Sequence, residues 1–317
     1  MNSLPLELIR GLHNIKPHHR GNVVTIGTFD GVHLGHQAII RQVVEQAERL
    51  QLSSMAMIFE PQPHEFFSGI KAPARLMRLR EKILALATAG VQRVFCLQFN
   101  CYLSNLSAQE FIDRILLEGL DTKHLIVGDD FRFGCDRNGD YSLLSEVGAR
   151  SGFTVSNTKT YIIDGERVSS TWVRRLLAAG QFSLAATLLG RPYTISGNVV
   201  RGQQLGRQLG SPTANVHLHR YRSPLQGVFA VTVSLPTGEK VAGVANVGVR
   251  PTLGGNKKPL LEVHLLDRND DLYDSTIVVE FKHKLREEQR FDDIKQLRAQ
   301  IQCDLQTARD FFLNCFS

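Results

Sequence analysis

The sequence predicts an α/β domain built on a parallel sheet, followed by an antiparallel β-barrel domain with a C-terminal helix. In the first half, short buried strands alternate with helical patterns, which indicates right-handed crossovers between parallel strands. In the second half, strand patterns separated by turn residues predominate. The length of 317 residues also fits two domains, because a typical domain has roughly 150 residues.

Hydrophobic periodicity predicts the elements of the first domain. Short apolar runs predict strands at 23–26, 55–59, 94–99 and 125–127. Apolar residues spaced by three and four predict helices at 34–50, 80–89 and 108–117. Ligands of parallel sheets bind at the carboxyl ends of the strands, so we expect functional residues just after these runs.

The pattern changes near residues 190–192, and we place the domain boundary there, with one domain at 1–186 and the other at 187–317. Before it, Ser170 could cap a short helix through Leu177, with Gly180 just past its end. After it, β-branched runs predict strands at 228–235, 241–247, 261–266 and 276–281. Their spacing favours an antiparallel barrel, and an apolar stripe predicts a helix from about Asp292.

Composition limits the classes of function. The chain is 43% hydrophobic and 21% charged, as in ordinary soluble globular proteins. Its net charge of +6 suits small anionic substrates such as ATP, and without a long basic run we expect no nucleic-acid partner. The five cysteines are irregularly spaced, which argues against a disulfide framework and for a cytoplasmic protein. We expect no signal peptide and no membrane span, and the oligomeric state is not predicted.

The first chemical motif joins a buried strand to a helix. It runs from Gly27 to His36 as GTFDGVHLGH. A helix N-terminus suits a phosphate, and Gly31 and Gly35 leave room for a ligand near the backbone. His33 and His36 are three residues apart, so they lie on one face of the first turn. Two alternatives remain: a metal site completed by Asp30, and a pair of surface histidines that cap the helix.

The second motif is glycine-rich and lies between strand patterns, from Gly197 to Val216. It is neither a P-loop nor a dinucleotide fingerprint, because no G-K-[ST] and no helix pattern follow it. Its backbone N–H groups could bind phosphate oxygens. Thr213 and Asn215 offer neutral oxygens that suit Mg²⁺. The alternative is a long barrel connection whose glycines only form turns.

The first motif resembles the H-x-G-H nucleotidyltransferases, in the form G-x-F-D-G-V-H-x-G-H of bacterial bifunctional riboflavin kinase/FAD synthetases. The segments FEPQP (59–63), VGDDFRFG (127–134) with RNGD (137–140), and SSTWVR (169–174) are similar to further motifs of that family. The resemblance implies a Rossmann-like nucleotidyltransferase domain. One departure is Gln62, where many relatives carry histidine, so the role of this position is open.

This resemblance also implies roles for residues of the first domain. His33 and His36 would act in catalysis. The ATP site would comprise Gly27, Phe29, Asp30, Gly31, His33, Gly35, His36, Ser170, Thr171 and Arg174. The FMN site would comprise Asp129, Phe131 and Arg137.

The second half resembles riboflavin kinases. The strings that carry this resemblance are GNVVRGQQLGRQLGSPTANV (197–216), GVANVGVRPT (243–252) and LREEQRF (285–291). It implies that Glu262 is the catalytic base. The kinase ATP site would comprise Gly197, Gly202, Gly206, Arg207, Thr213 and Asn215, with Mg²⁺ on the last two. The flavin site would comprise Glu262, Arg286 and Glu288.

The implied activity is bifunctional. Riboflavin and ATP would give FMN, and FMN and a second ATP would give FAD and pyrophosphate. We expect two triphosphate cradles, one beneath the paired imidazoles and one inside the barrel. From the residues alone, Glu262 could instead be a solvent-facing strand residue that alternates with buried Leu261 and Val263. Two other functions remain open: a nucleotidyltransferase with another acceptor, and a flavin- or RNA-sensing protein without catalysis.

Overall fold

The computed structural model describes residues 6–201, 213–251, 257–268 and 270–315, and contacts within the chain divide it into two compact units. The first unit comprises Met1–Pro73 and Leu79–Ser169, and the second comprises Ala74–Arg78 and Ser170–Ser317. The boundary at residues 186 and 187 stays a prediction. Within the described part of the chain, no helix is long and apolar enough to cross a membrane.

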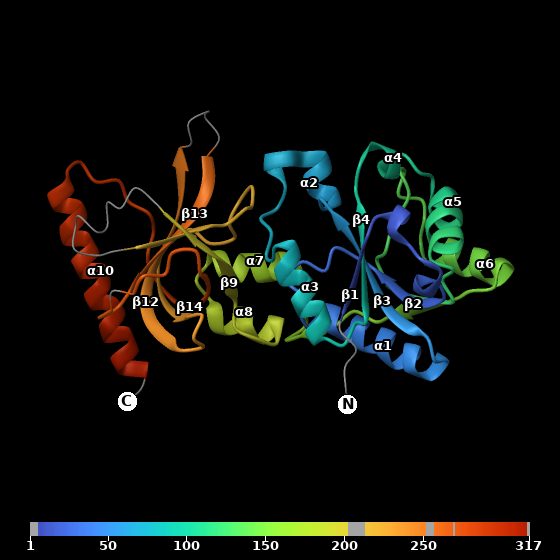
Figure 1. The fold of residues 1–317 in the computed structure, drawn as a ribbon, viewed down its shortest axis with the longest axis horizontal. Helices are drawn as coiled ribbons and strands as arrows, with labels where there is room; N and C mark the ends of the chain where they lie inside the picture. Colours follow the sequence, from blue (N-terminus) through green and yellow to red (C-terminus); the bar gives the residue numbers. More distant parts are fainter. Residues whose placement is uncertain (1–5, 202–212, 252–256, 269, 316–317) are drawn as a thin grey trace. The chain divides into compact units, whose positions relative to one another are not determined.

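The first unit is built on a six-stranded sheet in which all neighbouring strands are parallel, as predicted (Figure 1). The strand order is β1-β4-β3-β2-β5-β6. The strands are β1 (Glu7–Arg10), β2 (Asn22–Ile26), β3 (Ser53–Glu60), β4 (Arg93–Gln98), β5 (His124–Gly128) and β6 (Thr154–Thr158). The sequence patterns did not predict β1 and β6, which lie at the two edges of the sheet.

Helices α1 (Leu34–Leu50) and α3 (Leu79–Thr88) agree with the predicted ranges to within one residue. The predicted helix at 108–117 is α5 (Ala108–Phe111), which continues as the π-helical segment η4 (Ile112–Gly119). The remaining helices are α2 (Pro63–Ser68), α4 (Cys101–Ser104) and α6 (Tyr141–Ser151), with short 3₁₀ turns η1 (Leu12–Asn14), η2 (Pro17–His19) and η3 (Gly69–Lys71). A small hairpin, β7 (Ile162–Ile163) and β8 (Glu166–Arg167), precedes the end of this unit.

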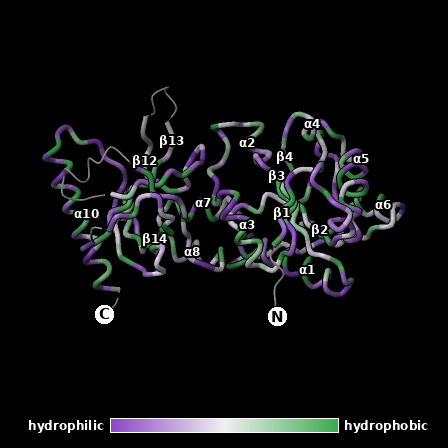
Figure 2. The backbone as a smooth tube through the Cα atoms, viewed as in Figure 1, coloured by the Kyte–Doolittle hydropathy of each residue, from purple (hydrophilic) through white to green (hydrophobic). Residues whose placement is uncertain are grey.

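Both faces of the parallel sheet are buried. Alternate residues of β2 belong to two different hydrophobic clusters, Val24 and Ile26 to a large one and Val23 to a smaller one with Val43 and Ala47 of α1. The central strands are accordingly coloured as largely hydrophobic in Figure 2. This explains why the strands appear in the sequence as continuous apolar runs rather than as alternating patterns.

The strand order contains a switch in direction beside β2. The chain passes from β2 to β3 and β4 on one side, and β5 and β6 then pair on the other side of β2. In sheets of this type, ligands bind where the order reverses, outside the carboxyl ends of the strands. The two segments that leave the sheet at this point begin at Gly27 and Asp129.

The second unit contains a closed barrel in which all neighbouring strands are antiparallel, as predicted. Its order is β10-β13-β12-β11-β14-β9. The strands are β9 (Thr194–Val200), β10 (Ala214–His217), β11 (Gly227–Ser234), β12 (Lys240–Pro251), β13 (Lys257–Leu265) and β14 (Thr276–Arg286). The helices are α7 (Ser170–Ala178), α8 (Phe182–Leu189) and α10 (Ile294–Cys315). Ser170 is the first residue of α7, not a cap before it.

Helix α10 identifies the outer face of the barrel. Its Leu305 and Ala308 pack against Val228 and Ala230 of β11 and Val244 of β12. A 22-residue helix cannot lie within six strands, so these strand residues face outward. The residues that alternate with them, such as Phe229, Val231 and Ala245, are fully buried and face inward. Apolar side chains therefore fill the barrel.

Candidate active sites

The turn between β2 and α1 has an unusual backbone. Phe29, Gly31 and Val32 have φ angles of 46°, 86° and 41°, and Phe29, Asp30 and Val32 are buried. Positive φ is costly for a β-branched residue such as Val32, and such strain concentrates at functional sites. The turn brings the N-terminus of α1 to the edge of the sheet, where its N–H groups can face an anion.

The structure brings His33 and His36 together at this N-terminus. Their rings stack with centroids 3.7 Å apart and an interplanar angle of 18°. His33 is the N-cap of α1, and its Nδ1 accepts a hydrogen bond from the backbone N–H of His36 at 3.4 Å. Because Nδ1 accepts, neutral His33 carries its proton on Nε2. The Phe29 ring makes a T-shaped contact with the His36 ring, with centroids 5.2 Å apart.

The surroundings of His36 favour a neutral ring. Burial, followed by electrostatic repulsion from His33, Lys82 and Arg167, holds the pKa of His36 well below its usual value of 6.5. Its Nδ1 is buried and has no hydrogen-bond partner among the described residues. A bound phosphate would oppose the effect on the pKa, because an anion favours the protonated ring. The pair is therefore suited to respond to a negatively charged ligand.

Two cationic residues near this pair were not identified from the sequence. Lys82 of α3 is fully buried, and Arg167 of β8 forms an ion pair with Asp130, with 2.8 Å between Nη2 and Oδ2. The hydrogen bond from Arg167 lowers the pKa of Asp130. Neither residue stands in a recognisable motif. A lysine at a helical position normally faces water, so no sequence signal indicated that Lys82 is buried.

The segment after β5 carries the residues predicted to bind FMN. Asp129 accepts a hydrogen bond from the Thr160 hydroxyl at 2.5 Å, and Phe131 stacks on Phe133 with centroids 5.5 Å apart. Arg137 is exposed, with a positive φ of 59°. This segment and the start of α1 leave adjacent strands at the switch point. The topology therefore brings the two predicted halves of the adenylyltransferase site to one edge of the sheet.

Gln62 follows β3 at the same edge of the sheet. It is buried, and its backbone N–H donates to Glu65 Oε2 at 3.1 Å. Its side-chain Nε2 has no partner within the described ranges. Phe66 and Phe67 of α2 each contact Phe99, with centroids 5.3 and 5.7 Å apart, and Phe67 is 68% exposed. A buried donor beside an exposed aromatic surface is suited to a polar, planar ligand.

The third predicted part of this site lies on α7. Ser170, Thr171 and Arg174 are in the first turns of that helix, in the second unit. Arg174 Nε donates to the carbonyl of Ala74 at 2.6 Å. In the first unit, the chain that leads to α7 passes the start of α1, because a Cβ on Gly35 would lie 3.4 Å from the Val168 carbonyl oxygen.

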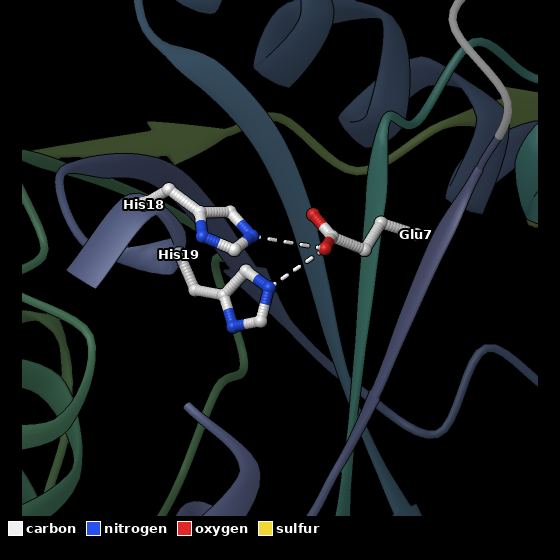
Figure 3. Close-up of side chains that lie close together, drawn as sticks. All are labelled: Glu7, His18 and His19. Atoms are coloured by element: carbon white, nitrogen blue, oxygen red, sulfur yellow. Dashed lines mark hydrogen bonds and ion pairs between the residues drawn. The ribbon is translucent and has the colours of Figure 1, made fainter. Parts of the chain in front are cut away.

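The alternative metal site at Asp30, His33 and His36 is not supported. Across residues 6–201, 213–251, 257–268 and 270–315, only Glu7, His18 and His19 bring three ligand atoms within 4.8 Å of one another (Figure 3). His19 and His18 contact Glu7 Oε1 at 2.7 and 3.2 Å. Burial would raise the pKa of Glu7, but these hydrogen bonds outweigh it and lower the pKa.

This cluster is held by hydrogen bonds. The backbone N–H of Lys16 donates to His19 Nδ1 at 2.9 Å, so the proton of neutral His19 is on Nε2 and points at Glu7. A metal ion on Nε2 would displace this proton and disrupt the Lys16 bond. Arg93 Nε donates to the other oxygen of Glu7 at 3.2 Å. The cluster therefore ties η2 to strands β1 and β4.

In the barrel, Gly202, Gly206 and Arg207 lie outside the described residues. Gly197 is buried in β9, and a Cβ there would lie 2.4 Å from Cγ1 of Val216 on β10. Its lack of a side chain therefore allows close packing of two strands. Thr213 is half-buried just before β10, and Asn215 is 5% exposed within it.

The barrel places Asn215, Glu262 and Asn246 in one row across β10, β13 and β12. Glu262 pairs directly with both asparagines, and Asn246 pairs with outward-facing Val228. The row therefore lies on the outer face of the barrel, and the expected triphosphate cradle inside the barrel stays a prediction. Asn246 Nδ2 donates to Glu262 Oε2 at 3.5 Å, and Asn215 Oδ1 is buried without a partner among the described residues.

Glu262 does alternate with buried Leu261 and Val263, but it is itself half-buried beside polar neighbours rather than fully solvated. Glu288 lies near the same row, because a Cβ on Gly248 would lie 2.1 Å from its Oε1. Its other oxygen accepts from Gln226 Nε2 at 3.0 Å. The structure thus brings Glu262 and Glu288 to one region of the outer face.

Arg286 has a different environment. Its Nε and Nη2 donate to the two carboxylate oxygens of Asp304 on α10, at 2.8 and 2.7 Å. Its Nη1 donates to the carbonyl of Glu287 at 2.9 Å. Asp304 also accepts from Gln300, and it is 6% exposed. Arg286 therefore fastens the end of β14 to α10.

Comparisons with known proteins match two parts of the chain to two different protein families. Residues 15–172 match the FAD synthetase family model, and residues 189–312 match the riboflavin kinase model. A bifunctional riboflavin kinase/FMN adenylyltransferase from Pseudomonas fluorescens is 55% identical, covering 96% of this chain and 97% of the relative. That of Escherichia coli K12 is 50% identical, covering 97% and 98%.

The crystal structure of a protein from Streptococcus pneumoniae, described as a macrolide-efflux protein, has the same fold. Its TM-score is 0.77 at 28% identity, covering 96% of this chain and 99% of that one. Together with the two family models and the near full-length relatives, this similarity accounts for both units. The chain belongs to the bifunctional riboflavin kinase/FMN adenylyltransferase family of transferases.

Proposed function

We propose that this chain phosphorylates riboflavin with ATP to give FMN, and then adenylylates FMN with a second ATP to give FAD and pyrophosphate. The observation that supports it best is the presence of two separate polar sites. One lies at the switch point of the α/β unit, in the part that matches FAD synthetases. The other is the row around Glu262 on the barrel, in the part that matches riboflavin kinases.

In the kinase reaction, Glu262 acts as the general base. The 5′-hydroxyl of riboflavin is a weak nucleophile, so a positioned carboxylate that takes its proton lowers the barrier. The hydroxyl oxygen forms a bond to the γ-phosphorus, the bond to the β–γ bridging oxygen breaks, and ADP leaves. Arg286 supports the flavin side by holding the segment that carries Glu288.

A Mg²⁺ ion fits the same face of the barrel. Asn215 Oδ1 is buried without a partner among the described residues, and Thr213 lies two positions before it. Neutral oxygens of this kind suit a hard cation, and Asn215 stands directly opposite Glu262. The ion, when bound, would neutralise charge on the ATP phosphates.

The adenylyltransferase reaction needs no strong base, because the FMN phosphate is already anionic. Its oxygen attacks the α-phosphorus, and pyrophosphate leaves. We assign the stabilisation of this charge to His33, His36 and the N-terminus of α1, with further positive charge from Lys82 and Arg167. Ser170, Thr171 and Arg174 would contact the triphosphate.

On the acceptor side of this site, Asp129, Phe131 and Arg137 would contact FMN. Gln62 offers its buried N–H donor at the same edge of the sheet. Gly27, Phe29, Asp30, Gly31 and Gly35 shape the turn that precedes the helix. These residue roles are proposals, and so is a cytoplasmic location, which rests on the irregularly spaced cysteines.

The test is to follow products by chromatography after mixing the protein with riboflavin, ATP and Mg²⁺. We expect FMN to accumulate first and FAD to follow. Absence of any phosphorylated flavin would contradict the proposal. Turnover of another phosphate acceptor, such as NMN or phosphopantetheine, without turnover of flavin would favour a nucleotidyltransferase of different specificity.

A further inference from the structure

Asn246 occupies the centre of the polar row on the barrel, and no role has been assigned to it so far. On β12 it pairs with Glu262 of β13 on one side and with Val228 of β11 on the other. Its Nδ2 is the donor to Glu262 Oε2 at 3.5 Å. Asn246 is half-buried, so its amide is partly shielded from water where it meets this carboxylate.

A second carboxylate approaches Asn246 from the side of Gly248. The two residues are two positions apart on β12, so they point to the same face. A Cβ on Gly248 would lie 2.1 Å from Glu288 Oε1 and 3.7 Å from Asn246 Nδ2. The amide group of Asn246 therefore lies in the region of two carboxylates, Glu262 and Glu288. A neutral side chain with two N–H donors suits that position, because an ionised carboxylate accepts hydrogen bonds but cannot donate one.

We propose that Asn246 is the positioning residue for Glu262, the base in the proposed kinase reaction. Glutamate has a flexible side chain, and a general base must stay within hydrogen-bond reach of the proton that it takes. Donation from Nδ2 to Oε2 fixes the plane of the Glu262 carboxylate and thereby the direction of Oε1. The 3.5 Å distance is long for a hydrogen bond, and such contacts often shorten when substrates bind. This inference rests on the proposed role of Glu262.

Two substitutions test it, with kinase turnover measured against FMN adenylyltransferase turnover of the same sample. Asn246→Ala removes the donor. Asn246→Asp keeps the shape but adds a negative charge beside Glu262 and Glu288. We expect Asn246→Ala to lower kcat of the kinase about 10- to 100-fold, with KM for ATP and riboflavin within about threefold of wild type. We expect Asn246→Asp to be at least as slow.

The relative kinase activities of Asn246→Ala and Asn246→Asp distinguish a positioning role from a merely structural one. An amide that only fills space would be replaced better by aspartate than by alanine. Asn246→Asp more active than Asn246→Ala would therefore overturn the proposal, and so would kcat of Asn246→Ala within twofold of wild type. Loss of both activities in both variants would also overturn it, because it would show a role in folding. The matched control is Asn198→Ala in the same barrel, whose exposed side chain accepts a hydrogen bond from Thr276 at 2.6 Å.

Glu262→Gln separates a failure of this inference from a failure of the proposed function. Full kinase activity in Glu262→Gln would show that Glu262 is not the base, and the proposed role of Asn246 would then fail as well. An inactive Glu262→Gln together with a normal Asn246→Ala would overturn only the role of Asn246.

Discussion

Arg286 and Asp304 form a two-point ion pair between β14 and α10, with N–O distances of 2.8 and 2.7 Å. Both side chains are largely buried: counting side-chain atoms alone, Arg286 is 18% and Asp304 8% exposed. Asp304 directly precedes Leu305, which packs against the barrel together with Ala308 of the same helix. It therefore determines how the end of β14, and the adjacent Glu288, are held against the barrel.

Asp304→Ala should destabilise the barrel unit. It leaves the guanidinium of Arg286 largely buried without its partner, which costs roughly 2–4 kcal/mol, below the full cost for a deeply buried pair because Arg286 retains some exposure. Differential scanning calorimetry would record this as a lower transition temperature. Asp310→Ala is the control, because Asp310 is exposed on the same helix and bonds only Gln306 at 2.9 Å among the contacts described. Equal melting of both variants and wild type would show that the pair adds no stability.

The two activities should be separable by single substitutions. Glu262→Gln removes the proposed base and should lower FMN formation by about 100-fold or more, while FAD formation from supplied FMN is unchanged. His36→Ala should do the reverse, because it removes a donor at the N-terminus of α1, with a loss of about 100-fold. Separate assays of the two reactions provide the measurement, and circular dichroism checks folding. If either substitution abolished both activities in a folded protein, the assignment of one site to each unit would fail.

The protonation of His36 should make stability depend on pH in the acid range. Burial, then His33, Lys82 and Arg167, lower the pKa of His36 in the folded state from its usual 6.5. As the pH falls below 6.5, the unfolded chain binds a proton at His36 that the folded state disfavours, so the free energy of unfolding decreases. Above pH 6.5, the His36 ring is neutral in the folded and the unfolded state, so it adds no pH dependence to the free energy of unfolding.

The variant His36→Asn removes this titration. Between pH 7.5 and pH 5.5, the melting temperature of wild type should fall by a few degrees more than that of His36→Asn, roughly as expected for about 1 kcal/mol. Parallel curves for the two proteins would show that His36 titrates normally. Saturating ATP should reduce the difference, because its phosphates favour the protonated ring.

Gly197→Ala tests whether this glycine serves packing or nucleotide binding. The new Cβ would lie 2.4 Å from Val216 Cγ1, so β9 and β10 must move apart, at a cost of about 1–3 kcal/mol. We expect a lower melting temperature and an unchanged KM for ATP in the protein that remains folded. Gly238→Ala is the contrasting variant: its Cβ meets open space but its φ is 88°, so it shows the cost of backbone strain without a clash, whereas Gly197 is not in the left-handed region. A raised KM without loss of stability would indicate contact with ATP instead.

Local sequence rules were sufficient where the partners are close along the chain. The proximity of His33 and His36 was predicted from their spacing of three residues, and the turn before them is indicated by Gly31. The bounds of α1 were predicted to the residue, since its hydrophobic period continues over 17 residues. The edge strands β1 and β6 were missed because β1 is only four residues long and β6 is largely polar.

The residues that surround the candidate catalytic groups could be identified only from the tertiary structure. A period of two shows that Glu262 points away from Leu261, but not which face of the barrel it occupies or that Asn215 and Asn246 lie beside it. Those facts depend on the register of strands that are joined by long connections. Lys82 and Asp304 show the same limit, because their burial depends on what packs over their helices.

The sequence by itself therefore determined the two-part architecture and the local shape of each motif, because short-range periodicity and turn chemistry act within a few residues, while the family followed from the resemblance of its motifs to those of known enzymes. Only the tertiary structure decided that Glu262, Asn215 and Asn246 form one row on the outer face of a barrel filled with apolar side chains, and that Arg286 pairs with Asp304. These relationships arise when segments tens of residues apart close one sheet and one helix covers it, and no local pattern records that closure.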